Sequence, residues 1–286
     1  MSLVKLICFD LDGTLLKNNK ELTPRTVEAL QRAADAGIYL VPTTGRLYDG
    51  VPEEIRSLPF IRYVIGANGA EVYDGREKKV LRRAEMNLDE VRQFFDYVRD
   101  LPAIVGCYKG GQGFMGRKDM EKMAAYSAEK AIFRMMKRVY APVEELESFL
   151  LDTGETVQKL MLFFADLEEQ RRVIEDMRKK LSNLVVSSSI INNIEVNARG
   201  ANKGAALKFL REYLKIEHEE TVAFGDGSND ITMLLEAGTG FAMGNACPEA
   251  KEAADKVTLS NEQGGVAFEI ERILEFKNSP PSSLLK

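Results

Sequence analysis

The sequence predicts an α/β protein: a doubly wound, mostly parallel, Rossmann-like sheet core with an inserted α+β domain. Three observations lead to this fold class. Short apolar runs alternate with amphipathic helical patterns at both ends of the chain, as in parallel sheets covered by helices. Two of these runs end directly in clustered acids. The stretch 84–190 has a different texture, and no acidic pair follows any of its apolar runs.

Length and composition describe an ordinary globular protein. Its 286 residues, 45% hydrophobic and 29% charged, are enough for two domains. The net charge of −5 gives no reason to expect a nucleic acid as partner. No apolar run approaches the roughly 18 residues that a bilayer span requires, and the N-terminus lacks the order of a signal peptide. We therefore expect neither nucleic acid nor membrane as a partner.

The cysteines and the histidine limit the kinds of catalytic and metal sites that the chain can form. Cys8, Cys107 and Cys247 lie far apart without a CxxC pair, which argues against a zinc site or a disulfide framework and suits a reducing cytoplasm. The one histidine, His218, lies in an acidic run, which disfavours Ser-His-Asp catalysis and His-rich metal sites. We expect a cytoplasmic protein whose chemistry uses carboxylates, lysine, hydroxyls and a metal.

The first apolar run, residues 4–9, predicts a strand that is buried on both faces. It stops at Asp10, and Asp12 follows two residues later. Ligands of open α/β sheets bind beyond the carboxyl ends of strands, so both acids lie where chemistry is expected. Two such close carboxylates resist joint ionisation unless a cation such as Mg²⁺ lies between them. The plainer alternative is an Asp-rich turn in which Gly13 supplies the bend.

A βαβ unit follows. Thr23 and Pro24 open a helix that ends at Gly37, and residues 38–41 form the next strand. Because the two strands would be parallel, the side chains of Thr44 and Arg46 should approach Asp10. A hydroxyl, adjacent backbone N–H groups and a guanidinium suit an anion such as phosphate. A helix cap with a surface arginine is the alternative.

Further strands are expected at 63–66 and, as a hairpin, at 71–73 and 79–81. The segment 67–70 between them predicts a turn. Asn68 in this turn could face the site, although a turn asparagine is the simpler interpretation.

The stretch 84–190 predicts an inserted α+β domain with its own core. Asn87 caps its first helix. Strands are expected at 104–108, 157–164 and 184–190, and helices near 118–126, 143–150 and 167–181. The glycine-rich stretch 109–114 predicts a hairpin turn more than a phosphate-binding loop, because no helix follows it.

The texture of the first domain returns at 194–196, which we assign to the core, so the core comprises 1–83 and 191–286. Lys203 begins a helix, where a cation is unfavourable with the helix dipole. It should therefore meet a negative group, unless it is simply solvated.

The last part of the chain repeats the pattern of a strand followed by acids. An apolar strand at 222–225 runs into Asp226 and Asp230, and Ser228 is a candidate cap of the helix 231–237. A final strand begins at Phe241. A closing helix reaches Phe276, and the tail from Lys277 is expected to fray.

These strand ends define one constellation, made up of Asp10, Asp12, Thr44, Lys203, Asp226 and Asp230. Four carboxylates in one cleft need compensation. One lysine and a divalent cation supply three positive charges, which would attract a phosphate dianion. In-line phosphoryl transfer to a carboxylate fits these groups.

With these motifs the sequence resembles the haloacid dehalogenase-superfamily phosphatases, specifically the Cof-like group with a type IIB cap. The matching pieces are FDLDGTL (9–15), TTGR (43–46), the Asn68-Gly69 turn, Lys203-Gly204, GDGSND (225–230) and AMGNA (242–246). They cover both ends of the chain in the family's order, whereas the middle third matches only in size, place and texture. The family usually has alanine or serine where Thr43 stands.

The resemblance implies roles for individual residues. Asp10 is the nucleophile that becomes aspartyl-phosphate, and Asp12 is the acid and base. Mg²⁺ is held by the Asp10 carboxylate, the Asp12 backbone carbonyl and Asp226, with Asp230 orienting waters or Lys203. The groups expected to hold the phosphoryl oxygens are Thr44, Lys203, Asn229 and the N–H groups of Gly45 and Leu11. Arg46 is expected to touch phosphate or substrate, and the inserted cap to close over the cleft and select the leaving group.

The expected function is that of a Mg²⁺-dependent phosphatase acting on a small phosphorylated metabolite, with a sugar phosphate foremost. Two alternatives stay within the superfamily: a phosphomutase, and a phosphatase for a phosphorylated disaccharide or glycerate ester. A receiver-like phospho-acceptor module is a third, but it would need neither Asp12 nor an insert. A glycosyltransferase DxD motif would leave GDGSND and Lys203 unexplained. We expect a monomer or a small homo-oligomer.

Overall fold

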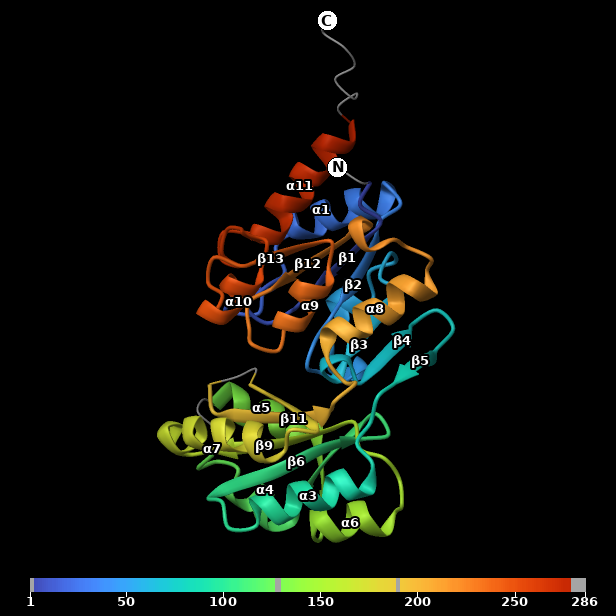
Figure 1. Ribbon diagram of the computed structural model, residues 1–286. Coiled ribbons are helices and arrows are strands. Elements are labelled where there is room, and N and C mark those ends of the chain that lie inside the picture. Colours follow the sequence, from blue (N-terminus) through green and yellow to red (C-terminus); the bar gives the residue numbers. More distant parts are fainter. Residues whose placement is uncertain (1–2, 127–129, 189–190, 279–286) are drawn as a thin grey trace, which may run out of the picture.

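The computed structural model describes residues 3–126, 130–188 and 191–278. Two lobes lie one above the other (Figure 1). Each has its own cluster of buried apolar side chains. The described part of the chain therefore has two cores, as the change of texture near residue 84 indicates.

The upper lobe is built on a five-stranded sheet of order β14-β13-β12-β1-β2. Its strands are β1 (Leu6–Phe9), β2 (Tyr39–Pro42), β12 (Thr221–Gly225), β13 (Thr239–Ala242) and β14 (Lys256–Val257). Every neighbouring pair is parallel, with Leu6 opposite both Tyr39 and Thr221. This arrangement confirms the predicted mostly parallel α/β sheet.

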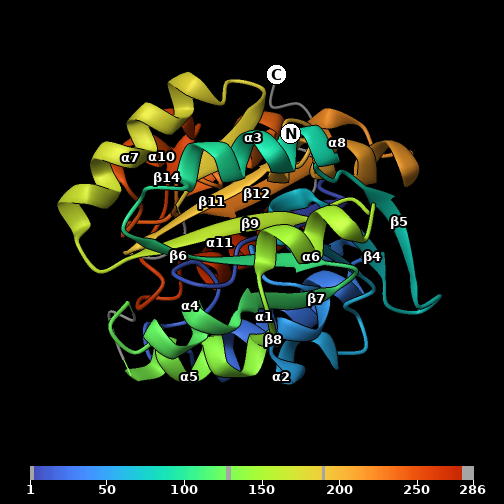
Figure 2. The ribbon, with the colours of Figure 1, turned by 90° about the horizontal axis from the view of Figure 1, so that it is seen from below.

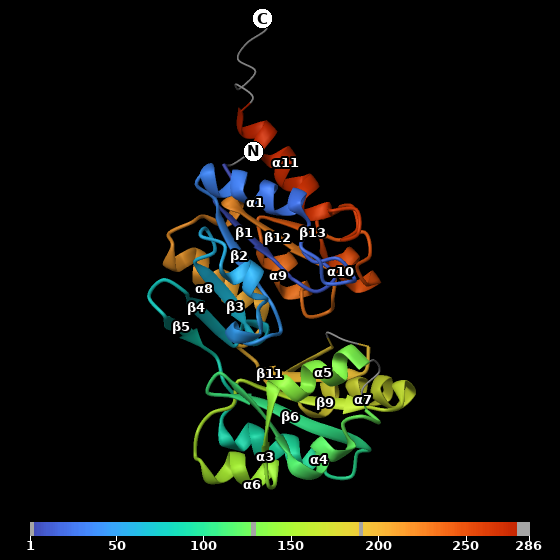
Figure 3. The ribbon, with the colours of Figure 1, turned by 180° about the vertical axis from the view of Figure 1, so that it is seen from behind.

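Helices cover both faces of this sheet. They are α1 (Pro24–Asp35), α8 (Lys203–Tyr213), α9 (Ile231–Glu236), α10 (Pro248–Ala253) and α11 (Gly265–Asn278). The pair α1 and α11 packs on one face, and α8 and α9 pack together on the other (Figures 1 and 3). The start of α1 is as expected: Thr23 accepts a hydrogen bond from the Thr26 N–H, and Pro24 occupies the first turn.

A small antiparallel sheet extends the core toward the second lobe. It consists of β3 (Tyr63–Gly66), β4 (Glu71–Asp74) and β5 (Lys79–Arg83), so the expected hairpin is confirmed. A parallel bridge between Thr43 and Ile65 joins the end of β2 to β3. The short helices nearby are η1 (Tyr48–Gly50), α2 (Glu53–Arg56) and η2 (Ala67–Gly69); η3 (His218–Glu220) precedes β12.

The lower lobe is built on a six-stranded sheet of order β10-β11-β9-β6-β7-β8 (Figure 2). Its strands are β6 (Ala103–Lys109), β7 (Gln112–Gly116), β8 (Tyr140–Val143), β9 (Lys159–Phe164), β10 (Leu184–Ser187) and β11 (Asn193–Ala198). Its helices are α3 (Leu88–Val98), α4 (Arg117–Lys122), α5 (Lys130–Val139), α6 (Leu146–Asp152) and α7 (Leu167–Lys180).

Two local predictions for this lobe are confirmed. Asn87 and Glu90 form a reciprocal capping box at the start of α3. Gly110 and Gly111 join β6 to β7 with φ angles of +58° and +81°, conformations that glycine adopts readily and tight hairpins require.

The assignment of residues 194–196 to the core sheet is wrong. They lie in β11, which pairs antiparallel with β9 and β10 in the lower lobe. All residues of β11 are buried, and a buried strand looks alike in either sheet. We propose that the second domain boundary lies after Ala198; the boundary near residue 84 stays a prediction.

Other differences are smaller. The strand expected at 184–190 ends at Ser187, and residues 189–190 lie outside the described residues. The helix expected at 143–150 begins at Leu146, because residues 140–143 form β8. The predicted frayed tail lies outside the described residues from position 279.

The chain crosses between the lobes between β5 and α3, and again between β11 and α8. Arg82, at the end of β5 beside the first crossing, reaches the second, since its guanidinium donates to the Gly200 carbonyl at 2.5 Å; it also donates to the Gly69 carbonyl of η2 at 2.6 Å. Among the described residues no helix has the length and apolar character to cross a membrane.

Candidate active site

The candidate site lies where the parallel strands of the core end, facing the second lobe (Figure 1). Asp10 follows β1, Thr44 lies just beyond β2, and Asp226 follows β12. Because β1 is paired with both β2 and β12, the three ends are neighbours. The predicted convergence of strand ends is therefore present.

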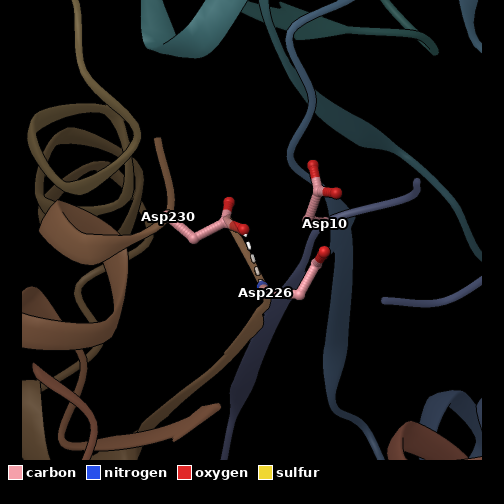
Figure 4. Close-up of side chains that lie close together, drawn as sticks. All are labelled: Asp10, Asp226 and Asp230. Carbon is pink, nitrogen blue, oxygen red and sulfur yellow. Dashed lines mark hydrogen bonds between the residues drawn. The ribbon is translucent and has the colours of Figure 1, made fainter. Parts of the chain in front are cut away.

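Three carboxylates form the centre of the site. One oxygen from each of Asp10, Asp226 and Asp230 lies within 4.8 Å of the others (Figure 4). Gly13 leaves the room that this requires: its φ is +88°, and a Cβ there would lie 2.4 Å from Asp226 Oδ2. Any side chain at position 13 would therefore displace the Asp226 carboxylate.

Lys203 neutralises part of this charge. It is fully buried at the first turn of α8, and its Nζ donates to Asp10 Oδ1 and to Asp230 Oδ1, both at 2.6 Å. Burial lowers the pKa of Lys203, but the charges of Asp10 and Asp230 outweigh it and raise that pKa above its ordinary value. The expectation that this lysine meets a negative group is confirmed.

Asp230 has all its oxygens engaged. While Oδ1 accepts from Lys203, Oδ2 accepts from the N–H groups of Asp226 and Gly227 at 2.8 and 2.9 Å. It thereby fixes the loop after β12 against α8. Ser228 was expected to cap α9, which is wrong: the helix begins after Asp230 without a side-chain cap, and Ser228 Oγ donates to the Ser188 carbonyl.

The other two carboxylates of the cluster are less compensated. Burial raises the pKa of Asp10 well above its ordinary value; Lys203 opposes this, and the neighbouring carboxylates add to it. Burial also raises the pKa of Asp226 to about 6, although Thr14 Oγ1 donates to its Oδ1 at 2.7 Å. Ionising these two carboxylates side by side costs free energy, and a bound cation would offset that cost.

The Asp12 side chain points to a different set of partners. Arg46 binds it with two hydrogen bonds, from Nε at 2.9 Å and from Nη2 at 2.7 Å, and Lys20 Nζ lies 2.9 Å from Oδ1. Burial raises the pKa of Asp12, but the charges of Arg46 and Lys20 outweigh it and lower that pKa below its ordinary value. The carboxylate is therefore held as an anion here.

The loop after β2 carries the other predicted anion-binding groups. Thr44 is buried, and its Oγ1 accepts from the Arg46 N–H at 3.2 Å. The Gly45 carbonyl accepts from Lys159 Nζ at 2.6 Å. Leu11 is buried between the two aspartates of the first motif. Thr44 therefore organises a turn and caps no helix, since η1 begins after Leu47 without a side-chain cap; anion binding by TTGR stays a prediction.

A chain of buried and half-buried polar groups connects this loop to the second lobe. Lys159 Nζ donates to Glu195 Oε1 at 2.7 Å, and Glu195 Oε2 accepts from Asn68 Nδ2 at 2.6 Å. Asn68 Oδ1 in turn accepts from Asn229 Nδ2 at 3.1 Å. A Cβ on Gly45 would lie only 3.0 Å from Asn68 Oδ1, so glycine permits this approach. We call Lys159, Glu195, Asn68 and Asn229 the interlobe relay.

The relay includes residues that the sequence analysis did not single out. Asn68 was interpreted as a turn residue; its φ of +58° fits a turn, yet its side chain is buried in the relay. Lys159 and Glu195 lie inside apolar strands to which the sequence assigns no site. A charged residue within a strand of otherwise buried apolar neighbours was the signal that could have found both.

A divalent cation fits the carboxylates present. Oxygen ligands from acidic side chains are what Mg²⁺ prefers, and the buried Asp10 and half-buried Asp226 carry charges that Lys203 alone does not balance. Asp230 is the least suited of the three to bind an ion, since its oxygens already accept three hydrogen bonds.

Comparison with known proteins points to one family. The family model of haloacid dehalogenase-like hydrolases matches residues 7–270. A 5-amino-6-(5-phospho-D-ribitylamino)uracil phosphatase of Bacillus subtilis is 32% identical over 92% of this chain and 93% of its own. An HMP-PP phosphatase of Yersinia pseudotuberculosis is 29% identical over 92% of this chain and 93% of its own.

Solved structures agree on the fold. A structure described as that of the subclass IIB sugar phosphatase BT4131 superimposes with a TM-score of 0.77, covering 94% of this chain and 98% of the other at 23% identity. This likeness extends over both lobes, so it includes the insert as well as the parallel sheet.

Proposed function

This chain belongs to the haloacid dehalogenase-like hydrolases and is a phosphatase of small phosphorylated metabolites; from that premise we propose that it uses Mg²⁺ and an aspartyl-phosphate intermediate. The observation that carries the proposal is the buried Asp10 carboxylate, held by Lys203 at 2.6 Å beside Asp226 at the end of β1. A carboxylate fixed by a lysine in a charged, buried pocket is suited to attack phosphorus.

Asp10, Asp226 and the Asp12 backbone carbonyl are the groups that we propose hold Mg²⁺. When bound, the ion would neutralise charge on the transferring phosphoryl oxygens. Its ligands come from two strand ends that β1–β12 pairing keeps together.

The first half-reaction transfers the phosphoryl group to Asp10. A carboxylate oxygen of Asp10 bonds to phosphorus while the bond from phosphorus to the ester oxygen breaks. Asp12 gives its proton to that leaving oxygen, so an alcohol departs. Lys203 keeps the Asp10 carboxylate oriented through its bond to Oδ1.

The second half-reaction restores the protein. Asp12 takes a proton from water, whose oxygen bonds to phosphorus as the bond to Asp10 breaks. Inorganic phosphate leaves, and Asp10 is again a carboxylate. Thr44, Asn229, Lys203 and the N–H groups of Leu11 and Gly45 are the proposed contacts of the phosphoryl oxygens.

Asp12 must carry a proton in the first step, yet Arg46 and Lys20 hold it as an anion. We therefore assign Arg46 a second partner. If its guanidinium leaves Asp12 for an anionic oxygen of the substrate, the pKa of Asp12 rises and the acid can form. This fits the expectation that Arg46 touches phosphate or substrate.

Relatives support the class of substrate but not one compound. Two phosphatases of similar identity to this chain carry names with different substrates, a phosphorylated uracil derivative and HMP-PP. Sugar phosphates remain our first candidates. The receiver-like alternative is set aside because the relatives are enzymes, and no observation favours a phosphomutase. The cytoplasmic location and the oligomeric state stay predictions.

The test is a phosphate-release screen over sugar phosphates, nucleotides and cofactor phosphates with Mg²⁺ present. We expect release from at least one class, complete loss with a chelator, and recovery when Mg²⁺ is returned. Full activity in the chelator would refute the metal requirement. Isomerisation of a sugar phosphate without phosphate release would favour the phosphomutase instead.

A further inference from the structure

A cleft of about 710 Å³ lies between the two lobes, beside the candidate active site. Its core wall is the segment 46–56, with η1 and α2. Its other wall comes from the insert, with Tyr108, the β6–β7 turn and the end of α5. A volume of this size would accommodate a small metabolite.

The cleft is connected to the catalytic aspartates through Arg46. Arg46 lines the cleft, and its guanidinium binds Asp12 at 2.7 Å. Tyr108 in the opposite wall lies under Lys159 of the interlobe relay, with Nζ 4.9 Å from the ring centroid. A molecule whose phosphoryl group reaches Asp10 would therefore extend its remaining atoms into this space.

The lining of the cleft is positively charged. Four arginines, Arg46, Arg56, Arg134 and Arg138, face two carboxylates, Asp49 and Glu53. Asp12 neutralises Arg46 and Asp49 neutralises Arg56, yet four guanidinium groups still gather around this one cleft in a chain whose net charge is −5. Positive groups gathered from both lobes repel one another across the gap unless an anion lies between them.

The two arginines of the insert are arranged to act together. Arg134 and Arg138 are one helical turn apart on α5, so they share one face of the helix. On the core side, Arg56 binds Asp49 at 2.8 Å, but Asp49 is 84% exposed and easily exchanged for another anion. Guanidinium groups bind carboxylates and phosphates through paired hydrogen bonds.

We propose that the preferred substrate carries a second anionic group on its leaving alcohol, a carboxylate or another phosphate, and that Arg134, Arg138 and Arg56 bind it. This inference rests on the proposed phosphatase function and adds the class of substrate. The insert then selects the substrate by charge, and Arg46 lies between the anion in the cleft and the reacting phosphoryl group.

The first test compares substrates that carry one anionic group with substrates that carry two. Phosphate release would be measured with Mg²⁺ for glucose 6-phosphate and fructose 6-phosphate, which carry one anionic group. It would also be measured for 6-phosphogluconate, which has a carboxylate besides its phosphate, and for fructose 1,6-bisphosphate, which has a second phosphate. We expect kcat/KM to be at least about tenfold higher for one of the two doubly charged compounds. The compound with the higher kcat/KM shows whether the second group is a carboxylate or a phosphate.

The second test uses charge-neutral variants of the cleft. Arg138→Gln and the double variant with Arg134→Gln should lower kcat/KM for the doubly charged substrate by about tenfold or more, mainly through KM. Both should leave p-nitrophenyl phosphate hydrolysis unchanged. Arg92→Gln is the matched control, since Arg92 is exposed and belongs to α3, a helix on the side of the insert away from the core (Figure 1).

Equal kcat/KM for singly and doubly charged substrates, or no effect of the arginine variants, would overturn the proposal while the phosphatase function stood. Absence of all hydrolysis would instead refute the proposed function. In that case the dissociation constants of 6-phosphogluconate, fructose 1,6-bisphosphate and glucose 6-phosphate would be measured by calorimetric titration of the metal-free protein. If both doubly charged compounds bound no more tightly than glucose 6-phosphate, the charged cleft would be contradicted.

Discussion

Lys203 determines how the acids of the site can coexist. Its ammonium group bonds Asp10 and Asp230 at 2.6 Å each, so two buried carboxylates share one positive charge. Asp226 receives no such bond and keeps a pKa raised to about 6 by burial. The three acids of the cluster therefore differ in chemistry, although all come from similar strand-end loops.

Replacing Asp10 by asparagine tests the covalent route at this scale. The amide keeps an oxygen for Lys203 but cannot attack phosphorus, so we expect kcat to fall by about a thousandfold or more while the fold persists. Phosphate release and circular dichroism are the measurements. Asp35→Asn, at the exposed end of α1, should leave both unchanged. Turnover retained in Asp10→Asn would exclude an aspartyl-phosphate.

Much of the candidate site could be predicted residue by residue, and the reason is local. Asp10, Thr44 and Asp226 each follow a buried strand directly, and parallel pairing brings such ends together. Lys203 was detectable because a lysine at a helix start is unfavourable with the helix dipole unless a negative group lies beside it. The Asp12–Arg46 pair was not predictable, since which of several nearby anions a flexible guanidinium binds depends on the folded geometry.

At the scale of elements, β9 and β11 connect the two lobes. Each carries a fully buried charge, Lys159 and Glu195, whose ion pair is 2.7 Å long and only 2–4% exposed. Both strands also meet the core, because Lys159 donates to Gly45 and Glu195 accepts from Asn68. Asn197 of β11 adds a bond from its Nδ2 to the Ala67 carbonyl at 3.1 Å.

Lys159→Met tests whether this pair matters to the fold. The change leaves Glu195 buried with its charge unpaired, so we expect the free energy of unfolding to fall by about 3–5 kcal/mol. Urea denaturation measures it. Adding Glu195→Gln to Lys159→Met should recover part of the loss, because the orphaned charge is removed and an acceptor for Asn68 remains.

Lys180→Met serves as the control for that experiment. Lys180 pairs with Asp176 on the surface of α7 and is 63% exposed, so its loss should change the free energy of unfolding by no more than about 0.5 kcal/mol. A similar small effect in Lys159→Met would contradict the importance of the buried pair.

Elements were predictable where a period or a cap marks them, and less so where a strand is wholly buried. The capping box of α3 and the Gly110-Gly111 hairpin have local signals. The strand β11 has no local signal that assigns it to one of the two sheets, because strands buried on both faces occur in both lobes. Its partners, β9 and β10, could be identified only from the fold.

For the whole molecule, the charge of the site links metal binding to pH. The pKa of Asp226 is raised from 3.8 to about 6 in the folded protein, so the folded state holds this proton more tightly than the unfolded chain. Without metal, this group therefore favours the folded state at low pH, and the contribution is lost as pH rises through about 6. A cation competes with the same proton and gains affinity over that range.

We expect millimolar Mg²⁺ to raise the thermal unfolding midpoint more at about pH 7.5 than at about pH 5, since the proton lowers the ion's affinity about tenfold at the lower pH. Differential scanning fluorimetry with and without Mg²⁺ measures this shift. Asp226→Asn should remove most of it at both pH values. An equal shift at both pH values in the unaltered protein would contradict a metal site that includes this carboxylate.

The two crossings joined by Arg82 have a bearing on how such proteins diversify. An insert that departs and returns at neighbouring points can in principle be transplanted between relatives as one cassette, leaving the sheet beneath it undisturbed. In this protein such an exchange has a requirement, because two residues of the interlobe relay belong to the insert and the other two belong to the core. An insert without counterparts of Lys159 and Glu195 would leave Asn68 and the Gly45 carbonyl without these hydrogen-bond partners. Successful chimeras should therefore exchange the residues on both sides of this contact together.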